Sequence, residues 1–277
     1  MCTIGNVFLQ ESNGIITFKQ CDLDSKVEFN APIISAGKDD IKYLPFTRAG
    51  SKGPWSGINS YGVSFVAADS YLLKNDILQA VNEDIFAAYT KIVSDYKTAE
   101  DAANYMCEFY TGFNNPDILL INDHQSAFFI EANEGTVECI KLTENFFAST
   151  NHFRILPNAI QYRNNHSTYL RLERAEAILE RNTNALGVFK VLRDQYFGES
   201  VLSICRVNTI TPPQEDPYYT QATSIFFTDG FIVNCVYQLN GNPRTNKYIL
   251  ISDVFGDNTR QENLSIGELA KKLTDHS

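Results

Sequence analysis

Strand-like and helix-like segments follow one another in blocks along this 277-residue chain, and that order constrains its fold more than any other feature. Short apolar runs predict strands in the first third, two helices follow, and strands, helices and strands then return. A doubly wound parallel sheet would instead alternate one strand with one helix. The order predicts an α+β fold in which mostly antiparallel sheets carry helices on their outer faces.

The strands are predicted from apolar runs and turn residues. The N-terminal pair, 3–9 and 15–19, flanks Asn13-Gly14, a strong hairpin signal. A polar stretch, 36–60, contains Trp55 and is expected to be a loop that lines a site. The remaining strands are expected at 62–68, 117–121, 127–132, 136–140, 146–148, 201–205, 222–227, 231–236 and 247–251.

Five helices are predicted from apolar periodicity and capping residues. Thr98 with Asp101 and Ser265 with Glu268 have the spacing of a capping box, so helices are expected over 98–109 and 265–273. The others are expected over 76–96, 167–179 and 185–196. No linker divides the chain, so we expect residues 1–277 to form a single domain.

Charge and hydropathy narrow the class of partner. The chain carries 23 Lys and Arg against 33 Asp and Glu, a net charge of −10. Such a surface repels phosphate backbones and anionic lipids, so we expect neither a nucleic acid nor a membrane as partner. The sequence lacks a run of ~18 apolar residues and a signal-peptide pattern, which favours the cytoplasm. Assembly into a homo-oligomer is left open.

Common motifs for cofactors and metals do not occur. The sequence has no G-x-x-x-x-G-K-S/T, no G-x-G-x-x-G, no G-x-S-x-G and no H-E-x-x-H. None of the six cysteines forms a C-x-x-C pair. We therefore expect no cofactor and no metal. A Cys-His dyad of Cys205 or Cys139 with His152 is one alternative, without a supporting local signature.

Cys2 is the residue that points most directly to chemistry. An initiator Met before a small residue is normally removed, so the mature chain is expected to begin with Cys2. One residue then carries a thiol and a free α-amine whose reference pKa, about 7.7–8.0, suits a local base. Nucleophile and base are supplied together, which is one known way to activate a nucleophile.

Cys2-Thr3 opens the first strand, and after the hairpin the chain reads Thr17-Phe18-Lys19-Gln20-Cys21-Asp22. This arrangement resembles the N-terminal-nucleophile hydrolases, and within them the linear amide C–N hydrolases. That group includes penicillin V acylase, conjugated bile-acid hydrolase and the acyl-coenzyme A:6-aminopenicillanate acyltransferase. Its N-terminal hairpin ends in Arg-x-x-Asp, and the Asp contacts the cysteine. Asp22 matches that position, and Lys19 replaces the Arg, keeping the charge but not the bidentate fork.

Further matches continue the resemblance over nearly the whole chain. Thr150-Asn151-His152 resembles a motif whose Asn lies in the oxyanion hole, so the resemblance implies that role for Asn151. An Arg at the start of the next helix reaches the active site in the family, and Arg171 is the first choice. Arg174 and Arg206 are its competitors.

Three further residues are expected to bind substrate besides Lys19. Trp55 lies in the polar stretch, and Asn59 opens an Asn-x-x-Gly turn like that of the family. Asp69 departs from the family, which often carries Asn or Tyr as an oxyanion partner there. Its carboxylate is either turned away, with a backbone N–H taking that role, or it recognises a cationic group of the substrate.

The resemblance implies a four-layer αββα sandwich and acyl transfer through a thioester at Cys2. The expected substrate is a small acyl amide or acyl thioester. Hydrolysis of a linear amide is the first hypothesis, and transfer from a thioester donor to an amine is the second. A non-enzymatic binding protein on the same scaffold is the third.

Overall fold

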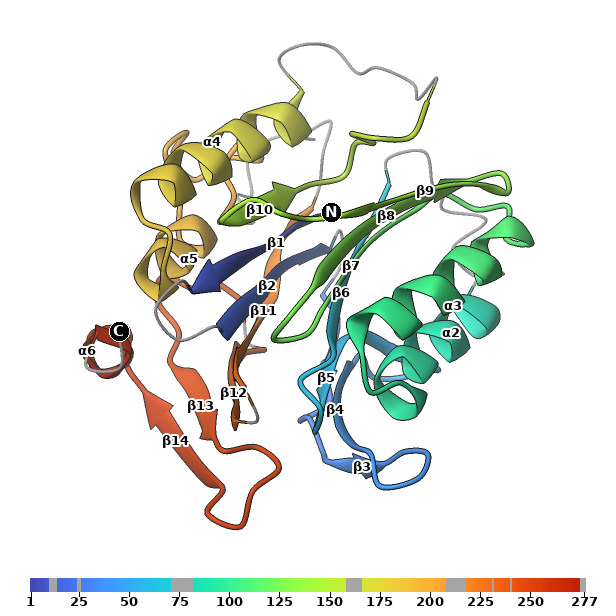
Figure 1. Cartoon of the computed structure of the whole chain (residues 1–277). Helices are drawn as coiled ribbons and strands as arrows, with labels where there is room; N and C mark the ends of the chain where they lie inside the picture. The colour runs from blue at the N-terminus through green and yellow to red at the C-terminus, as the bar shows by residue number, and fades with distance from the viewer. Residues whose placement is uncertain are drawn as a thin grey trace.

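Two seven-stranded sheets pack face to face between helical layers in the computed structural model of the chain (Figure 1). The structure describes residues 1–9, 14–23, 26–70, 82–157, 166–207, 218–230, 232–239 and 241–274. Within these ranges every strand pair is antiparallel. The predicted α+β class and the αββα sandwich are confirmed.

The first sheet contains the N-terminal hairpin, and its strand order is β10-β1-β2-β11-β12-β13-β14. Helices α4, α5 and α6 cover its outer face (Figure 1). Its strands are β1 (Cys2–Leu9), β2 (Gly14–Leu23), β10 (Phe146–Ser149), β11 (Tyr219–Asp229), β12 (Ile232–Gln238), β13 (Tyr248–Ser252) and β14 (Arg260–Leu264). The helices are α4 (Ser167–Arg181), α5 (Ala185–Leu192) and α6 (Ile266–Thr274).

The second sheet follows the chain in order, from β3 to β9. Helices α2 (Asn82–Asp95) and α3 (Ala99–Thr111) cover its outer face. Its strands are β3 (Ser35–Ala36), β4 (Lys42–Thr47), β5 (Pro54–Asn59), β6 (Ser64–Asp69), β7 (Asp117–Asn122), β8 (Ala127–Asn133) and β9 (Thr136–Lys141).

Three apolar layers hold the sandwich together, one between the sheets and one under each set of helices. Cys2 lies in the layer between the sheets, with Ile4, Phe46, Trp55 and Phe226 among its members. Strand alternation explains the division, because successive side chains of β1 point to opposite faces of the sheet. The hairpin that carries Cys2 therefore presents one row to the opposite sheet and one row to the helices.

A few buried polar side chains join the two sheets across this apolar layer. The Asn6 amide donates to Asn122 Oδ1 at 3.0 Å, and the Asn122 amide donates to Thr17 Oγ1 at 2.9 Å. The hydroxyls of Ser56 and Ser224 form a third bridge at 3.0 Å. Buried polar groups need such partners, so these bonds fix how one sheet sits on the other.

Local capping signals predicted several helix starts. Thr98 Oγ1 accepts from the Asp101 backbone N–H at the start of α3, and Ser265 with Glu268 forms the expected box before α6. The helix predicted over 185–196 is shorter, because it ends at Leu192. The first six residues of the helix predicted over 76–96 lie outside the described residues, as does Asn13 of the predicted turn.

Three strand assignments from sequence were wrong. The polar stretch 36–60 contains β4 and β5, so Trp55 lies on a buried strand rather than in a loop. Residues 201–205 form turns, where the hydroxyls of Ser200 and Ser203 bond to nearby backbone groups. Such local side-chain bonds compete with a sheet ladder. The strand β14 was missed because its sequence, RQENL, is polar.

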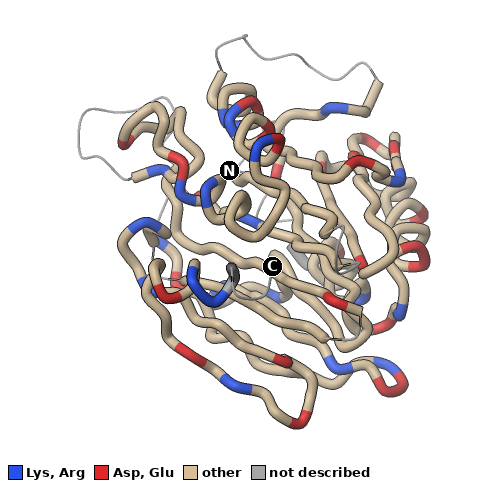
Figure 2. Tube along the Cα trace, turned by 60° about the vertical axis from the view of Figure 1, so that its left-hand side comes forward, with Lys and Arg blue, Asp and Glu red and all other residues tan. Residues whose placement is uncertain are grey.

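The charged residues of the described chain are interspersed, with acidic and basic positions mixed along the trace (Figure 2). None of the described helices is both long and apolar enough to span a membrane.

Candidate active site

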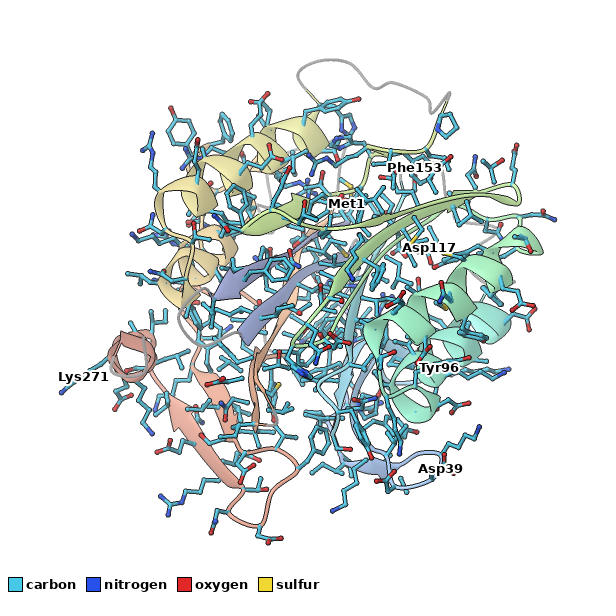
Figure 3. All side chains as sticks on the ribbon, viewed as in Figure 1. Met1, Asp39, Tyr96, Asp117, Phe153 and Lys271 are labelled. Atoms are coloured by element: carbon cyan, nitrogen blue, oxygen red, sulfur yellow. The ribbon has the colours of Figure 1, made fainter. Side chains whose placement is uncertain are left out.

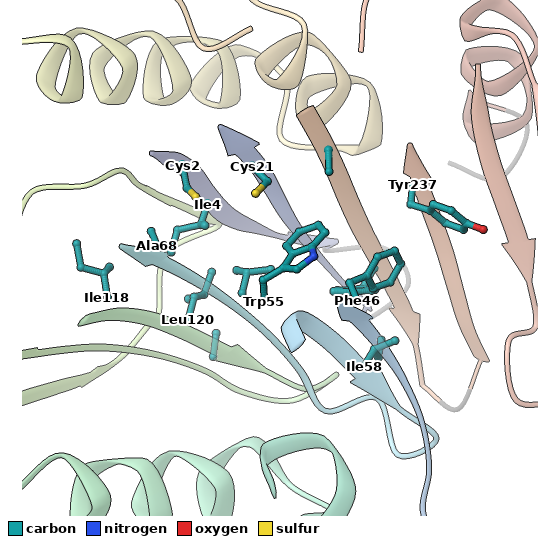
Figure 4. Close-up of a cluster of buried hydrophobic side chains, with 14 of the residues drawn as sticks. Cys2, Ile4, Cys21, Phe46, Trp55, Ile58, Ala68, Ile118, Leu120 and Tyr237 are labelled. Atoms are coloured by element: carbon teal, nitrogen blue, oxygen red, sulfur yellow. The ribbon is translucent and has the colours of Figure 1, made fainter. Parts of the chain in front are cut away.

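Cys2 begins the first strand and lies at the centre of the candidate site. Its side chain is 2% exposed and faces the second sheet (Figure 4). Cys2 pairs with Cys21 of β2, while its backbone groups face away from β2. The Cys2 N–H and carbonyl can therefore form hydrogen bonds with side chains on the other side of β1, and Asn151 and Arg171 form these bonds.

Asn151 and Arg171 hold the backbone of Cys2. The Cys2 backbone N–H donates to Asn151 Oδ1 at 3.0 Å, and Arg171 Nη1 donates to the Cys2 carbonyl at 2.5 Å. Arg171 Nη2 donates to the same Asn151 oxygen at 2.8 Å, and Nη1 also reaches Thr3 Oγ1 at 3.0 Å. The structure thus brings together three residues selected from sequence: Cys2, Asn151 and Arg171.

The loop after β10 and the start of α4 fix the positions of these two side chains. The Asn151 backbone N–H donates to Thr168 Oγ1 at 3.1 Å, and Thr150 Oγ1 donates to the Thr168 carbonyl at 2.9 Å. Arg171 lies one turn further along α4 and is fully buried. Its planar guanidinium can contact Cys2 and Asn151 at once, which a lysine ammonium does less well.

The surroundings of the Cys2 thiol favour the thiolate. A hydrogen bond from the Cys21 thiol and the charge of Lys19 hold the pKa of Cys2 well below its usual value, although burial opposes them. Lys19 lies two residues before Cys21 on the same face of β2. Its ammonium donates to the Ala67 carbonyl at 2.6 Å and stands 5.1 Å from the Trp55 ring centre. Lys19 therefore supplies a buried cation beside the thiol.

Asp22 lies on the opposite face of β2, toward the helices. Its carboxylate accepts from Thr220 Oγ1 at 2.8 Å and pairs with Arg206 Nε at 3.5 Å. Burial raises the pKa of Asp22 to about 6, while Arg206 and Arg171 pull it down. The pairing of β11 with β2 shifts register between Thr220 and Ala222, and this irregularity brings Thr220 opposite Asp22.

Met1 precedes Cys2 and occupies a buried position, labelled in Figure 3. Its ammonium donates to the Asp22 carbonyl at 2.7 Å, and the Asp22 N–H donates to the Met1 carbonyl at 2.8 Å. The N-terminal charge also helps to lower the pKa of the Asp22 carboxyl. The chain terminus therefore lies close to the Asp22 carboxyl.

Asp69 contacts the site through its backbone. Its carbonyl accepts from Asn151 Nδ2 at 2.5 Å. Asp69 is paired with Asp117 of β7, which is labelled in Figure 3. The Asp117 carboxylate accepts from Tyr89 of α2 and Tyr110 of α3. Paired residues share a face, so the Asp69 side chain lies toward these helices rather than the inter-sheet layer. Of the two alternatives for Asp69, this placement favours the one in which its carboxylate is turned away from the substrate. It does not favour recognition of a cationic group by Asp69.

The other two residues expected to bind substrate have different surroundings. Trp55 shares the inter-sheet layer with Cys2, and the Lys19 ammonium lies over its ring (Figure 4). Asn59 instead donates to the carbonyls of Val93 and Tyr96 and accepts from Tyr61 N–H and Val63 N–H. Backbone groups thus occupy both donor hydrogens and the oxygen of the Asn59 side-chain amide. Asn59 therefore has a structural role at the turn before β6.

The three arginines that the sequence left in competition occupy distinct places. Arg171 contacts Cys2, Arg206 pairs with Asp22, and Arg174 forms a more exposed pair with Asp194 at 2.8 Å. The sequence did not identify Thr220 or Cys21 as site residues. Only the sheet pairing reveals both, because each is brought to the site by a neighbouring strand.

His152 lies in the loop that carries Asn151, beside the start of α4. Burial lowers the pKa of His152 to about 4, and its Nδ1 lies 2.9 Å from Thr168 Oγ1. A neutral His152 therefore braces the loop that carries Asn151. The described residues also contain no group of three or more His, Cys, Asp or Glu side chains arranged to hold a metal ion.

Comparison with solved structures identifies the fold class. Penicillin V acylase from Agrobacterium tumefaciens matches with a TM-score of 0.61 at 14% identity, over 93% of this chain and 87% of that chain. The C2A mutant of conjugated bile acid hydrolase from Clostridium perfringens matches with a TM-score of 0.56 at 11% identity, over 96% and 97%. The N-acylethanolamine-hydrolyzing acid amidase ortholog of Caenorhabditis elegans matches with a TM-score of 0.54 at 12% identity, over 81% and 92%. The fold is that of the N-terminal-nucleophile hydrolases.

The family follows from the sequence itself. The profile of the acyl-coenzyme A:6-aminopenicillanic acid acyl-transferase family matches residues 22–211, and the chain belongs to that family. No curated protein matches the sequence. Membership places the chain among proteins that hydrolyse or transfer acyl groups.

Proposed function

We propose that this protein is a cysteine-dependent acyl-transfer enzyme whose nucleophile is Cys2, and that it hydrolyses a linear amide C–N bond. One observation carries the proposal: Asn151 and Arg171 form hydrogen bonds with the Cys2 backbone, while the Cys2 thiol lies close to the charge of Lys19. Family membership supports the acyl chemistry. The geometry supports the choice of the sulfur.

The mechanism requires that Met1 be removed, so that the active domain starts at Cys2. Cys2 is small, which suits removal of the preceding methionine. The nitrogen that then becomes the α-amine already lies 3.0 Å from Asn151 Oδ1. Asn151 thus provides an acceptor that orients the α-amine. The lone pair of the amine nitrogen is then free to take the thiol proton.

The reaction then proceeds in two steps. The α-amine takes the proton of the Cys2 thiol, and the resulting thiolate attacks the substrate carbonyl. The ammonium later returns this proton to the leaving nitrogen. The C–N bond breaks and a thioester to Cys2 remains. Water attacks the thioester, and the thiol re-forms as the carboxylic acid leaves.

Each surrounding residue has a distinct task in this scheme. Lys19 stabilises the thiolate, and Arg171 fixes the Cys2 carbonyl and Asn151 together. The Asn151 NH₂ group uses one hydrogen for the Asp69 carbonyl and turns the second toward the oxyanion. Asp22, braced by Arg206 and Thr220, stabilises the ammonium that forms when the α-amine takes the thiol proton.

Transfer of the acyl group from a thioester donor to an amine is the second candidate, because the family takes its name from such a reaction. Both reactions use the same thioester and the same residues. They differ only in the molecule that releases the acyl group from Cys2.

The test is a panel of acyl amides and acyl thioesters, with products followed by mass spectrometry. We expect wild-type enzyme to release free acid from at least one acyl amide, and Cys2→Ala to release none. A chain extended by Gly-Ser before Met1 is the matched control, since its Cys2 nitrogen remains an amide.

The outcomes separate the candidates. Free acid indicates the hydrolase, and a new amide formed only when an amine is added indicates the acyltransferase. If the extended chain or Cys2→Ala turned over as fast as wild type, the N-terminal cysteine mechanism would be excluded. No turnover across the panel would favour a binding protein.

A further inference from the structure

Cys2 and Cys21 lie directly opposite each other on neighbouring strands. Their Cα atoms are partners in the β1–β2 register. The adjacent pair, Met1 and Asp22, exchanges both of its backbone hydrogen bonds. Hydrogen-bonded and non-hydrogen-bonded pairs alternate in an antiparallel ladder, so Cys2 and Cys21 form a non-hydrogen-bonded pair.

That kind of pair has the geometry that a disulfide needs. Its Cα atoms are typically about 4.5 Å apart, within the range of about 4.4–6.8 Å found across disulfides. Both side chains lie on the same face of the sheet, and both point into the layer between the sheets (Figure 4). No change in the strand register is required to join the two sulfurs.

The two thiols have unequal chemistry. Cys21 donates a hydrogen bond to Cys2 and Lys19 adds a positive charge, so Cys2 is the sulfur that ionises. The same bond, together with burial, keeps Cys21 protonated with a raised pKa. A reactive thiolate with a second thiol beside it is the arrangement of an oxidation-sensitive cysteine with a resolving partner.

We propose that Cys21 is a resolving cysteine for Cys2, and that hydroperoxides convert the pair to a reversible disulfide that closes the active site. The loss of activity rests on the proposed function of Cys2, whereas the bond itself requires only the two thiols. The acyl group of a substrate must reach the Cys2 sulfur, and a hydroperoxide is small enough to follow the same path.

The oxidation proceeds in two steps. The Cys2 thiolate attacks the terminal oxygen of the hydroperoxide, the O–O bond breaks, and the departing alkoxide takes a proton to leave as an alcohol. Cys2 is now a sulfenic acid. The Cys21 sulfur attacks the Cys2 sulfur, the S–O bond breaks, and hydroxide leaves as water with the Cys21 proton. Two thiols have lost two electrons to one hydroperoxide.

A second close pair must be removed before the test. Cys107 of α3 and Cys139 of β9 also interact and are partly exposed, so they too have access to oxidants. In a Cys107→Ser/Cys139→Ser background, a protein mass lower by two hydrogens indicates a disulfide among the remaining four cysteines. Cys235, which lies buried in the same inter-sheet layer, provides a matched control.

The experiment treats this background protein with equimolar hydrogen peroxide, alkylates the remaining thiols and maps the peptides by mass spectrometry. We expect a linked peptide containing Cys2 and Cys21, lost again on treatment with dithiothreitol, with acyl turnover falling and returning in parallel. Cys235→Ala should give the same linked peptide. Cys21→Ala, treated with excess hydrogen peroxide because each further step consumes another equivalent, should instead accumulate sulfinic and sulfonic acid at Cys2, which dithiothreitol does not reverse.

Three results would overturn the proposal: Cys2 oxidised beyond sulfenic acid while Cys21 remains alkylatable, Cys2 linked to another cysteine, or both thiols alkylated after the peroxide is consumed. The peptide map of the background protein decides the matter even if Cys21→Ala fails to fold. A linked peptide without acyl turnover would refute the proposed function and leave the resolving role intact.

Discussion

At the scale of single residues, the candidate site divides into groups that hold Cys2 and groups that tune its thiol. Asn151 and Arg171 contact its backbone, while Lys19 and Cys21 act on the sulfur. This division separates position from reactivity. Variants at Asn151 can therefore distinguish a positioning role from a direct contact with the oxyanion.

Asn151→Ala removes both the acceptor of the Cys2 nitrogen and the NH₂ donor. We expect kcat to fall by about 10²–10³, the usual cost of an oxyanion donor. Asn151→Asp keeps an acceptor for Cys2 and Arg171 but loses the donor. If the donor serves the oxyanion, steady-state kinetics should show a large fall in kcat in Asn151→Asp as well, although that variant keeps the acceptor. A much milder effect of Asn151→Asp would assign Asn151 to positioning alone.

Asp117 predicts a measurable dependence of stability on pH. Burial raises its pKa to about 6 from a reference of 3.8, so the folded state binds more protons than the unfolded state between these values. The free energy of unfolding should thus fall by roughly 2 kcal/mol from this group as the pH rises from 4 to 6.

Asp117→Asn should reduce the slope by this share and leave the share of Asp22, whose pKa burial also raises to about 6, as measured by urea unfolding at pH 4, 5, 6 and 7. The matched control is Asp40→Asn, because Lys97 lowers the pKa of Asp40 to about 2 and its titration lies below this window. An unchanged slope between pH 4 and 6 in Asp117→Asn would contradict the assignment.

At the scale of secondary-structure elements, α4 shows how one helix serves the site with one face only. Arg171 is buried against β1, whereas Arg174 lies one turn further on and is paired with Asp194 nearer the surface. Both arginines lie in the helix that follows Thr150-Asn151-His152 in the sequence. Arg171 lies within the buried face of α4 and Arg174 at its more exposed edge, which gives them different tasks.

Arg171→Lys should lower kcat by about 10², because a displacement of the nucleophile by even 1 Å is that costly. The lysine ammonium cannot contact the Cys2 carbonyl and Asn151 with the same fork. Arg174→Lys serves as the matched control, and its kcat should stay within about twofold of wild type, since exposed ion pairs contribute little. Equal losses in both variants would argue against this reading of α4.

The same elements show what sequence can predict. Capping at Thr98 and Ser265 is local, so these helix starts were predicted correctly. The polar strand β14 was missed because neither its composition nor its pattern marks a strand, and only pairing with β13 defines it. The placement of Trp55 in a loop was wrong for the same reason, since its strand depends on neighbours in the sheet.

The site was predictable where motifs are local and not where sheet pairing assembles it. Cys2, Asp22, Asn151 and Arg171 each lie in a short motif, and three of them meet in the structure. Thr220 reaches Asp22 through a register shift about 200 residues further along the chain, which no local pattern encodes.

At the scale of the whole molecule, the two sheets are held by an apolar layer with a small number of polar bridges. Asn122 is the centre of one bridge, with contacts to Asn6 and Thr17 on the other sheet. Because Cys2 lies in the same layer, the relative position of the sheets sets the distance between its thiol and Trp55.

Asn122→Ala should lower the free energy of unfolding by about 2–4 kcal/mol, because it leaves buried polar groups without their partners. Urea denaturation at pH 7 measures this loss. Asn133→Ala, at the far end of the same β7–β8 hairpin and only half-buried, should cost less than about 1 kcal/mol. Similar losses in the two variants would show that the bridge adds little.

The identity of the nucleophile is tested most directly by trapping the acyl-enzyme. The protein is mixed with a reactive acyl amide or acyl thioester, quenched in acid within one turnover, and its N-terminal peptide is analysed by mass spectrometry. We predict a peptide that begins at Cys2 and carries the acyl group on its sulfur. An active enzyme that retained Met1, or an acyl group on any other residue, would contradict the N-terminal cysteine mechanism.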